Sequence, residues 1–203
     1  MAVPDRVRLV VIGFLACGFA ALAAVWIATL TKGDDAGAES SATTPYTGNV
    51  RPPGVRVPEF SLRDQDGKLA SPPRGTVAIY AFIYTHCKDD CPLEVAQIRS
   101  ALDELGHDVP VFGISVDPAN DTPASARSFL IKQKMTLRMR FLLGSERELA
   151  PIWKAFATLP QTPEKEHPAV LVVGDAKGEQ KLSYFLSQLT GSGLAADLKL
   201  LGA

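Results

Sequence analysis

Two cysteines separated by three residues, Cys87 and Cys91, are the residues of this 203-residue chain that are most clearly able to do chemistry. Pro92 follows the second thiol, and a single histidine, His167, stands well downstream before an apolar run. Two thiolates at this spacing can either bind a soft metal ion or exchange electrons through a disulfide. Because thiolates select Cu(I) over hard cations and imidazole also suits copper, His167 offers the third ligand of a trigonal Cu(I) site.

The residues around the cysteines predict a strand that leads directly into a helix. Residues 76–84 form a continuous apolar, β-branched and aromatic run, typical of a strand buried on both faces. Pro92 suits the first helical position, which makes Cys91 the expected N-cap. Apolar residues then recur at helical spacing up to Gly106, which fits the end of a helix. A helix N-terminus lowers the pKa of a nearby thiol and so favours both uses of the pair.

Predicted strands and helices alternate through the rest of the chain. This alternation, closed by a β-hairpin, fits a thioredoxin-like α/β domain. In such a domain the site lies at the carboxyl edge of the sheet, where strand ends meet helix N-termini. The expected strands are 60–63, 76–84, 109–115, 139–142, 169–173 and 181–185, and the expected helices are 92–105, 123–132, 145–156 and one that closes the chain.

The N-terminal region predicts a transmembrane anchor. Residues 9–30 form an uncharged, strongly apolar stretch long enough to cross a bilayer as a helix. Arg6 and Arg8 precede it, so residues 1–8 are expected in the cytoplasm and the rest of the chain outside it. A cleaved signal peptide is the alternative, but the apolar stretch is long and no small-residue cleavage site follows it cleanly. Apolar sequence continues past Cys17, which is therefore interpreted as a membrane residue.

The segments beyond the anchor predict a linker and a single exported domain. Residues 31–57 are rich in Gly, Ala, Ser, Thr and Pro without periodicity, which is typical of a flexible linker. Residues 58–203 are expected to form the domain. Its two cysteines indicate either a disulfide or a site whose redox state or metal content is controlled. The formal net charge of −1 and the lack of a basic cluster argue against nucleic acid as a partner.

From about Pro58 to the C-terminus the chain resembles the Sco/SenC family. The resemblance rests on three motifs that occur in the family's order: Tyr84-Thr-His-Cys-Lys-Asp-Asp-Cys-Pro-Leu-Glu94, then Ile114-Ser-Val-Asp-Pro118 with Asp121-Thr122, then Glu166-His167 before a strand. It implies a thioredoxin-like, membrane-anchored copper protein on the periplasmic side of the cell membrane, which assists assembly of the copper A centre of cytochrome c oxidase. It also implies Cys87, Cys91 and His167 as copper ligands, the copper A subunit as the recipient, and a thioredoxin-like protein as a possible reductant.

Two further features bear on the copper interpretation. Asp89, Asp90 and Glu94 bring negative charge to the cysteines, which opposes thiolate formation and favours a bound cation. Pro168 departs from the resemblance, since Sco proteins usually carry a hydroxyl or small residue after the histidine whereas thioredoxins carry a cis-proline in that loop. A cis bond between His167 and Pro168 would change how the imidazole faces the cysteines.

Other polar residues near the motifs have two interpretations. Asp117 could orient a copper ligand, or it could be a turn residue bonded to its own backbone. His86 follows the predicted strand directly and is expected to point away from the thiols. His107 falls in the turn that leaves the helix and is expected to be solvated.

Three functions of different classes follow from the cysteine pair. The first is a copper chaperone. The second is a thiol–disulfide oxidoreductase in which one thiolate of Cys87 and Cys91 attacks a target disulfide and the other resolves it. The third is a thiol peroxidase, which ranks last because Tyr84 stands where its usual loop carries Thr or Ser. A purely structural disulfide is disfavoured because a bridge across so short a loop adds little stability.

Overall fold

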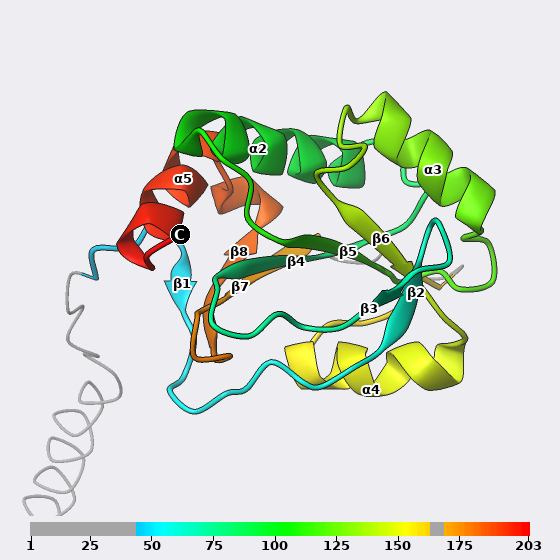
Figure 1. The fold of residues 1–203 in the computed structure, drawn as a ribbon, viewed down its shortest axis with the longest axis horizontal. Coiled ribbons are helices and arrows are strands. Elements are labelled where there is room, and N and C mark those ends of the chain that lie inside the picture. The colour runs from blue at the N-terminus through cyan, green and yellow to red at the C-terminus, as the bar shows by residue number, and fades with distance from the viewer. Residues whose placement is uncertain (1–43, 163–168) are drawn as a thin grey trace, which may run out of the picture. The chain divides into compact units, whose positions relative to one another are not determined.

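One mixed sheet forms the centre of the part of the chain that the computed structural model describes, residues 44–162 and 169–203 (Figure 1). The strands run in the order β1-β8-β7-β4-β5-β6-β2-β3, and β4, β5 and β6 are parallel, whereas β7 pairs with β4 in the antiparallel sense. Their bounds are β1 Asn49–Val50, β2 Leu62–Asp64, β3 Leu69–Ala70, β4 Ala78–Ile83, β5 Val111–Ser115, β6 Arg140–Leu143, β7 Val170–Gly174 and β8 Gln180–Phe185.

Helices cover both faces of this sheet. Helices α2, α3 and α5 lie on one face and α4 lies on the other (Figure 1). A short 3-10 helix, η1, joins β8 to α5. The bounds are α2 Asp90–Leu105, α3 Pro123–Lys132, α4 Glu146–Phe156, η1 Leu186–Gln188 and α5 Gly191–Leu200. This mixed α/β architecture is the one that the alternating sequence pattern predicts.

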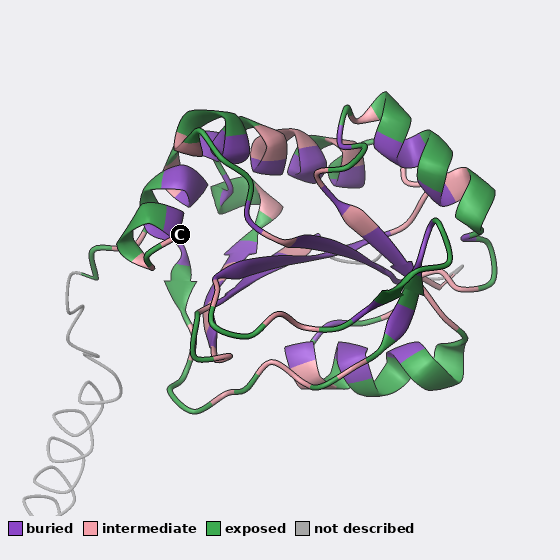
Figure 2. Cartoon of the chain, viewed as in Figure 1, coloured by how far each residue is buried: buried purple, intermediate pink, exposed green. Residues whose placement is uncertain are grey.

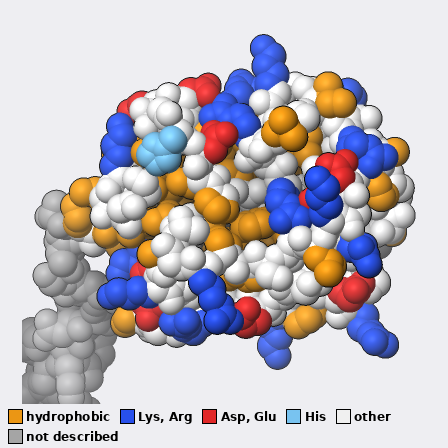
Figure 3. All heavy atoms as spheres, viewed as in Figure 1, with side chains coloured by type: hydrophobic (Ala, Val, Ile, Leu, Met, Phe, Trp, Pro, Cys, Tyr) orange, Lys and Arg blue, Asp and Glu red, His pale blue; other side chains and the backbone are white. Residues whose placement is uncertain are grey.

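Strand β4 packs in the hydrophobic core on both of its faces, as its continuous apolar run predicts. Every residue of β4 is buried, and the strand lies in the middle of the sheet (Figure 2). Ile79 and Ile83 pack in the cluster that α2, α3 and α5 cover. Tyr80 and Phe82 face α4, where both rings contact Phe156 at centroid distances of 5.1 and 5.0 Å. Figure 3 shows a face on which apolar side chains also gather in the middle.

The start of α2 differs from the sequence prediction by two residues. Its N-cap is Asp89 rather than Cys91, so Cys91 and Pro92 both lie in the first helical turn. The backbone N–H of Leu93 already donates to the carbonyl of Asp89 at 3.2 Å. Because the first N–H groups of a helix have no partner within it, proline is tolerated anywhere in that turn, and its position alone does not identify the first residue. Gly106 ends the helix in the left-handed conformation, as predicted.

The segment from Thr44 to Val57 belongs to the fold, whereas the sequence prediction assigned it to the linker. Strand β1 pairs with β8, and Asp197 of α5 accepts hydrogen bonds from the backbone N–H groups of Thr47 and Gly48 at 2.9–3.0 Å. A Cβ on Gly48 would approach the ring of Tyr184 to 2.5 Å, so only glycine fits this packing. A strand of two residues leaves no periodicity in the sequence, which is why composition alone suggested a linker.

The predicted anchor, residues 9–30, and the predicted linker up to residue 43 lie outside the described residues. Within residues 44–162 and 169–203, no helix combines the length and apolar character that a membrane span needs.

Candidate metal and redox site

Strand β4 and helix α2 bring the two cysteines to the carboxyl end of the central strands, as predicted. Cys87 lies in the loop after β4, and its backbone N–H donates to the carbonyl of Tyr84 at 3.4 Å. Cys91 lies in the first turn of α2. Both cysteines are free, and Cys91 is buried at 2% exposure whereas Cys87 is only half-buried. One sulfur of the pair is therefore accessible and the other is enclosed.

The two thiols are electronically unequal. The backbone N–H of Cys91 donates a hydrogen bond to Cys87 Sγ at 3.2 Å. Hydrogen bonding from the Cys91 side chain, followed by this backbone bond, lowers the pKa of Cys87 to about 6, although partial burial opposes the shift. The same interaction and burial raise the pKa of Cys91 above its ordinary value. At neutral pH the pair therefore carries a Cys87 thiolate and a Cys91 thiol.

Glu94 does not add the negative charge that the sequence suggested. Its side chain lies on the buried side of α2 at 1% exposure, and neither carboxyl oxygen has a hydrogen-bond partner among the described residues. Burial raises the pKa of Glu94 to about 8, and the charges of Cys87 and Asp90 contribute further. Since most of this group is protonated at pH 7, it does not oppose ionisation of Cys87.

Asp121 anchors the cysteine loop to the neighbouring strand. Its Oδ1 accepts the backbone N–H of Thr85 at 2.8 Å and the Thr85 hydroxyl at 2.7 Å. Its Oδ2 accepts the hydroxyl of Ser115, the last residue of β5, at 2.6 Å. Thr85 lies two residues before Cys87, so these bonds fix the point from which the loop departs. The sequence predicts no role for Asp121, although this residue belongs to one of the three motifs; its position just before the α3 N-cap, Thr122, is the signal from which the role could have been inferred.

Asp117 has the hydrogen bonds of a turn residue. Its carboxylate accepts from the side-chain amide of Asn120 at 2.9 Å, and its carbonyl accepts the backbone N–H groups of Asn120 and Asp121. This arrangement supports the turn interpretation of the two that the sequence left open. A role in orienting a copper ligand stays a prediction.

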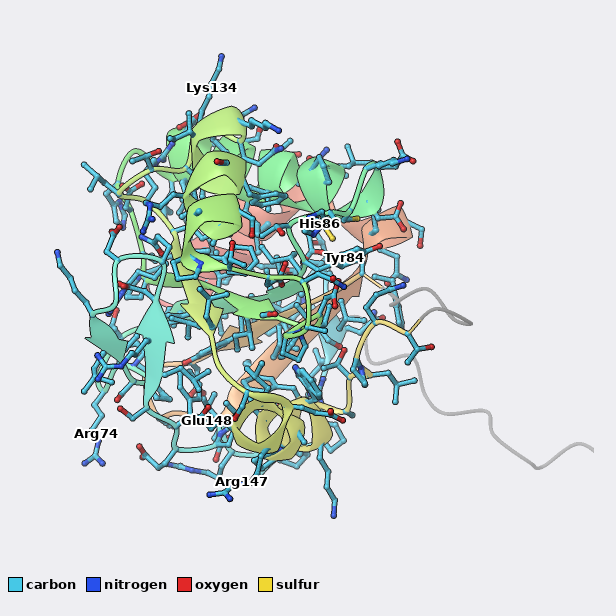
Figure 4. All side chains as sticks on the ribbon, turned by 90° about the vertical axis from the view of Figure 1, so that its right-hand side faces the viewer. Arg74, Tyr84, His86, Lys134, Arg147 and Glu148 are labelled. Carbon is cyan, nitrogen blue, oxygen red and sulfur yellow. The ribbon has the colours of Figure 1, made fainter. Side chains whose placement is uncertain are left out.

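The histidines of the prediction have different outcomes. His86 is exposed and its Nδ1 lies 3.1 Å from the Thr85 hydroxyl; Figure 4 places it beside the cysteine loop, close to Tyr84. His167, together with Pro168, lies outside the described residues. In the part of the chain that the structure describes, no group of three or more His, Cys, Asp or Glu side chains is arranged to hold a metal ion.

The start of β7 nevertheless lies at the same edge of the sheet as the cysteines. Strand β7 is antiparallel to β4, and Leu171 pairs with Ala81, two residues before β4 ends at Ile83. Val170, the first residue of β7, is therefore placed toward the carboxyl end of β4.

Comparisons with known proteins agree with this geometry. A family model described as SCO1/SenC matches residues 50–199. Protein SenC of Rhodobacter capsulatus is 37% identical over 95 residues, which cover 45% of this chain and 42% of SenC. Matches to three further curated relatives cover only 35–66% of the length of those relatives.

Solved structures share the fold. The copper-bound structure of ScoI from Bradyrhizobium japonicum superposes with a TM-score of 0.60 at 29% identity, covering 72% of this chain and 99% of that one. BsSco, described as a member of the Sco family of cytochrome c oxidase assembly proteins with a disulfide switch, has a TM-score of 0.65 at 25% identity, covering 76% and 98%.

Proposed function

This chain belongs to the SCO1/SenC family, and from that premise we propose that it binds Cu(I) and passes it to the copper A subunit of cytochrome c oxidase. The observation that carries the proposal is the reduced cysteine pair, with Cys87 held as a thiolate 3.2 Å from the Cys91 N–H. Soft sulfur ligands suit Cu(I). ScoI, a related protein, is solved with copper bound, and BsSco is described as an oxidase assembly protein.

The proposed ligands are Cys87, Cys91 and His167. The cysteines fit the metal because both sulfurs are unbridged and one is already ionised, whereas Cys91 would release its proton when copper binds. His167 precedes β7, and β7 begins at the edge of the sheet where β4 ends. That topology supports an imidazole ligand from this part of the chain.

We extend the proposal to the cellular setting. Residues 9–30 would anchor the chain in the cell membrane, with residues 1–8 in the cytoplasm and the folded part in the periplasm. The linker would be shorter than composition suggested, since the fold already begins at Thr44. A reporter that is active only in the periplasm should be active when it is fused after Ala203. Activity of a cytoplasmic reporter at the same position would instead indicate the opposite topology.

An anaerobic titration tests the copper proposal. The reduced full chain should remove one Cu(I) per molecule from a coloured chelator, because soft thiolates compete well for this ion. Replacing both Cys87 and Cys91 by Ser should abolish this uptake, and Cys17→Ser should leave it intact. Equal uptake by the double variant would place copper elsewhere in the molecule.

The inequality of the two thiols favours a second candidate, a thiol–disulfide oxidoreductase. The accessible Cys87 thiolate would attack a target disulfide, and Cys91 would then displace the target thiol and close a Cys87–Cys91 disulfide. A thioredoxin-like protein would supply two electrons to reopen it. The test is catalysed reduction of a disulfide peptide: loss of turnover in Cys91→Ser with trapping of a mixed disulfide on Cys87 would support this role.

A further inference from the structure

A groove lies beside Cys87, between the cysteine loop and helix α3. Its volume is about 580 Å³. We call it the α3 groove and define it by its principal lining residues. These are His86, Cys87 and Lys88 on the loop side, and Ser128, Phe129 and Lys132 on the α3 side.

The charged side chains that line the α3 groove are all positive. Lys88 and Lys132 line it, and no Asp or Glu is among its lining residues. Both lysines are exposed, and neither forms an ion pair with another residue of the described segments. Asp89 and Asp90 follow Lys88 in sequence but do not line the groove. A carboxylate that entered it would therefore meet two free ammonium groups.

Two carboxylates of neighbouring elements are already hydrogen-bonded elsewhere. Asp121 accepts hydrogen bonds from Thr85 and Ser115, and Asp117 accepts from Asn120. Asp89 and Asp90 are next to Lys88 in sequence, but among the described residues neither forms an ion pair with a lysine of the groove.

The groove also has direct access to the reactive sulfur. Cys87 lines it, whereas the buried Cys91 does not. Phe129, at 4% exposure, supplies an apolar surface beneath the polar rim. A chain segment lying in the groove would consequently have its neighbouring residues next to Cys87.

We propose that the α3 groove binds an acidic, extended segment of the protein with which Cys87 exchanges copper. The proposal rests on the proposed copper function and names the chemistry of its partner. The lysines hold the carboxylates of the segment, and Phe129 contacts its apolar atoms. The partner's metal ligands are thereby placed beside the accessible sulfur.

A pair of synthetic peptides tests this directly on the full chain. One is a short peptide of alternating Glu and Gly, and its matched control has Gln in place of each Glu. The acidic peptide should bind more tightly, and its affinity should fall with added salt. Backbone amide signals of Ser128 and Lys132 should shift in nuclear magnetic resonance spectra. Equal affinity for the two peptides would overturn the proposal.

Matched lysine variants distinguish binding in the groove from a general effect of the protein's net charge. Lys132→Gln should weaken binding of the acidic peptide about fivefold, as expected for the loss of one exposed ion pair. Lys134→Gln is the control, because Lys134 lies at the same end of α3 but points away from the molecule (Figure 4). It should change the affinity less than about twofold, since screening weakens distant charges. Equal losses in both variants would contradict a specific groove.

Cu(I) titration of the same samples keeps the two proposals apart. If the wild-type chain binds Cu(I) but shows no preference for the acidic peptide, the groove proposal fails and the copper function stands. If the acidic peptide binds with the expected variant pattern but Cu(I) is not taken up, the groove stands as a binding site and the copper function fails.

Discussion

Asp121 accepts both the backbone N–H and the hydroxyl of Thr85, so one carboxylate oxygen fixes the first residues of the cysteine loop in two ways. The other oxygen holds Ser115 at the end of β5. The positions of Cys87 and of β5 are thereby linked through a single buried side chain. This relationship, rather than any bond of Asp117, determines how the loop leaves the sheet.

Asp121→Ala should destabilise the domain and loosen the cysteine loop. Loss of three hydrogen bonds to a buried carboxylate is expected to lower the free energy of unfolding by about 2 kcal/mol. Denaturant unfolding of the metal-free protein measures this. Asp117→Ala is the matched control and should cost less than about 1 kcal/mol, because its partner Asn120 is exposed. A larger loss in the control would assign the loop anchor to Asp117.

Cys87 should react with alkylating agents at mildly acidic pH. Its pKa of about 6 predicts a half-maximal rate near that pH, because only the thiolate is nucleophilic. Cys91→Ala removes the side-chain hydrogen bond that contributes most to the shift, so the midpoint should rise toward the ordinary thiol value. The pH profile of iodoacetamide labelling measures both. An unchanged midpoint in the variant would show that backbone bonds alone lower the pKa.

Glu94 should make the metal-free protein less stable as the pH rises. Its pKa is about 8 in the folded state and 4.5 without burial, so the folded state binds the extra proton between these values. The stabilisation that protonated Glu94 contributes is fully present below about pH 4.5 and is lost as the pH rises through 8. Glu94→Gln should flatten this slope and gain on the order of 2 kcal/mol at pH 8.5, since no charge is then buried.

The Glu94 measurement needs a background without Cys87. The lowered pKa of that thiol works in the opposite direction, adding stability above about pH 6. Urea unfolding at pH 5 and pH 8.5 should therefore compare Cys87→Ala with the Cys87→Ala, Glu94→Gln double variant. The same pH slope in both proteins would contradict a buried, uncompensated Glu94.

His167→Ala should weaken Cu(I) binding at least tenfold, which corresponds to about 1.4 kcal/mol, because a three-coordinate site would lose its nitrogen ligand. The rate of disulfide reduction should hardly change, since that reaction has no need for this imidazole. His86→Ala is the control and should leave both properties near those of the wild type, as its ring bonds to Thr85. Wild-type copper affinity combined with slower disulfide reduction would favour the oxidoreductase function.

The strongest sequence patterns predicted the fold well. The run at 76–84 became the buried strand β4, and the predicted helices 123–132 and 145–156 became α3 and α4 to within one residue, with Thr122 and Ser145 as their N-caps. Strand β1 was missed because two residues carry no pattern. Its position depends instead on Asp197, which is 150 residues from Thr47 in sequence. Contacts of that separation leave no local signal.

The site was only partly predictable for a similar reason. The spacing of Cys87 and Cys91 identified the chemistry, but not which sulfur is exposed. That difference depends on how α2 packs, as does the burial of Glu94. A carboxylate in a motif gives no sign of its burial in the sequence, so Glu94 was assigned a charge that the folded environment suppresses.

The bonds of Asp197 have a mechanical consequence. Thr47 and Gly48 are held by this residue of α5, and β1 is paired to β8, so a pull on the chain at Thr44 is resisted first at that end of the sheet. The cysteine loop follows β4, from which β7 and β8 separate this point of attachment. A shorter path runs through the helices, because α5 packs directly against α2, whose first turn carries Cys91. A pull at Thr44 would therefore reach the sulfur pair through α5 and α2 sooner than through the sheet.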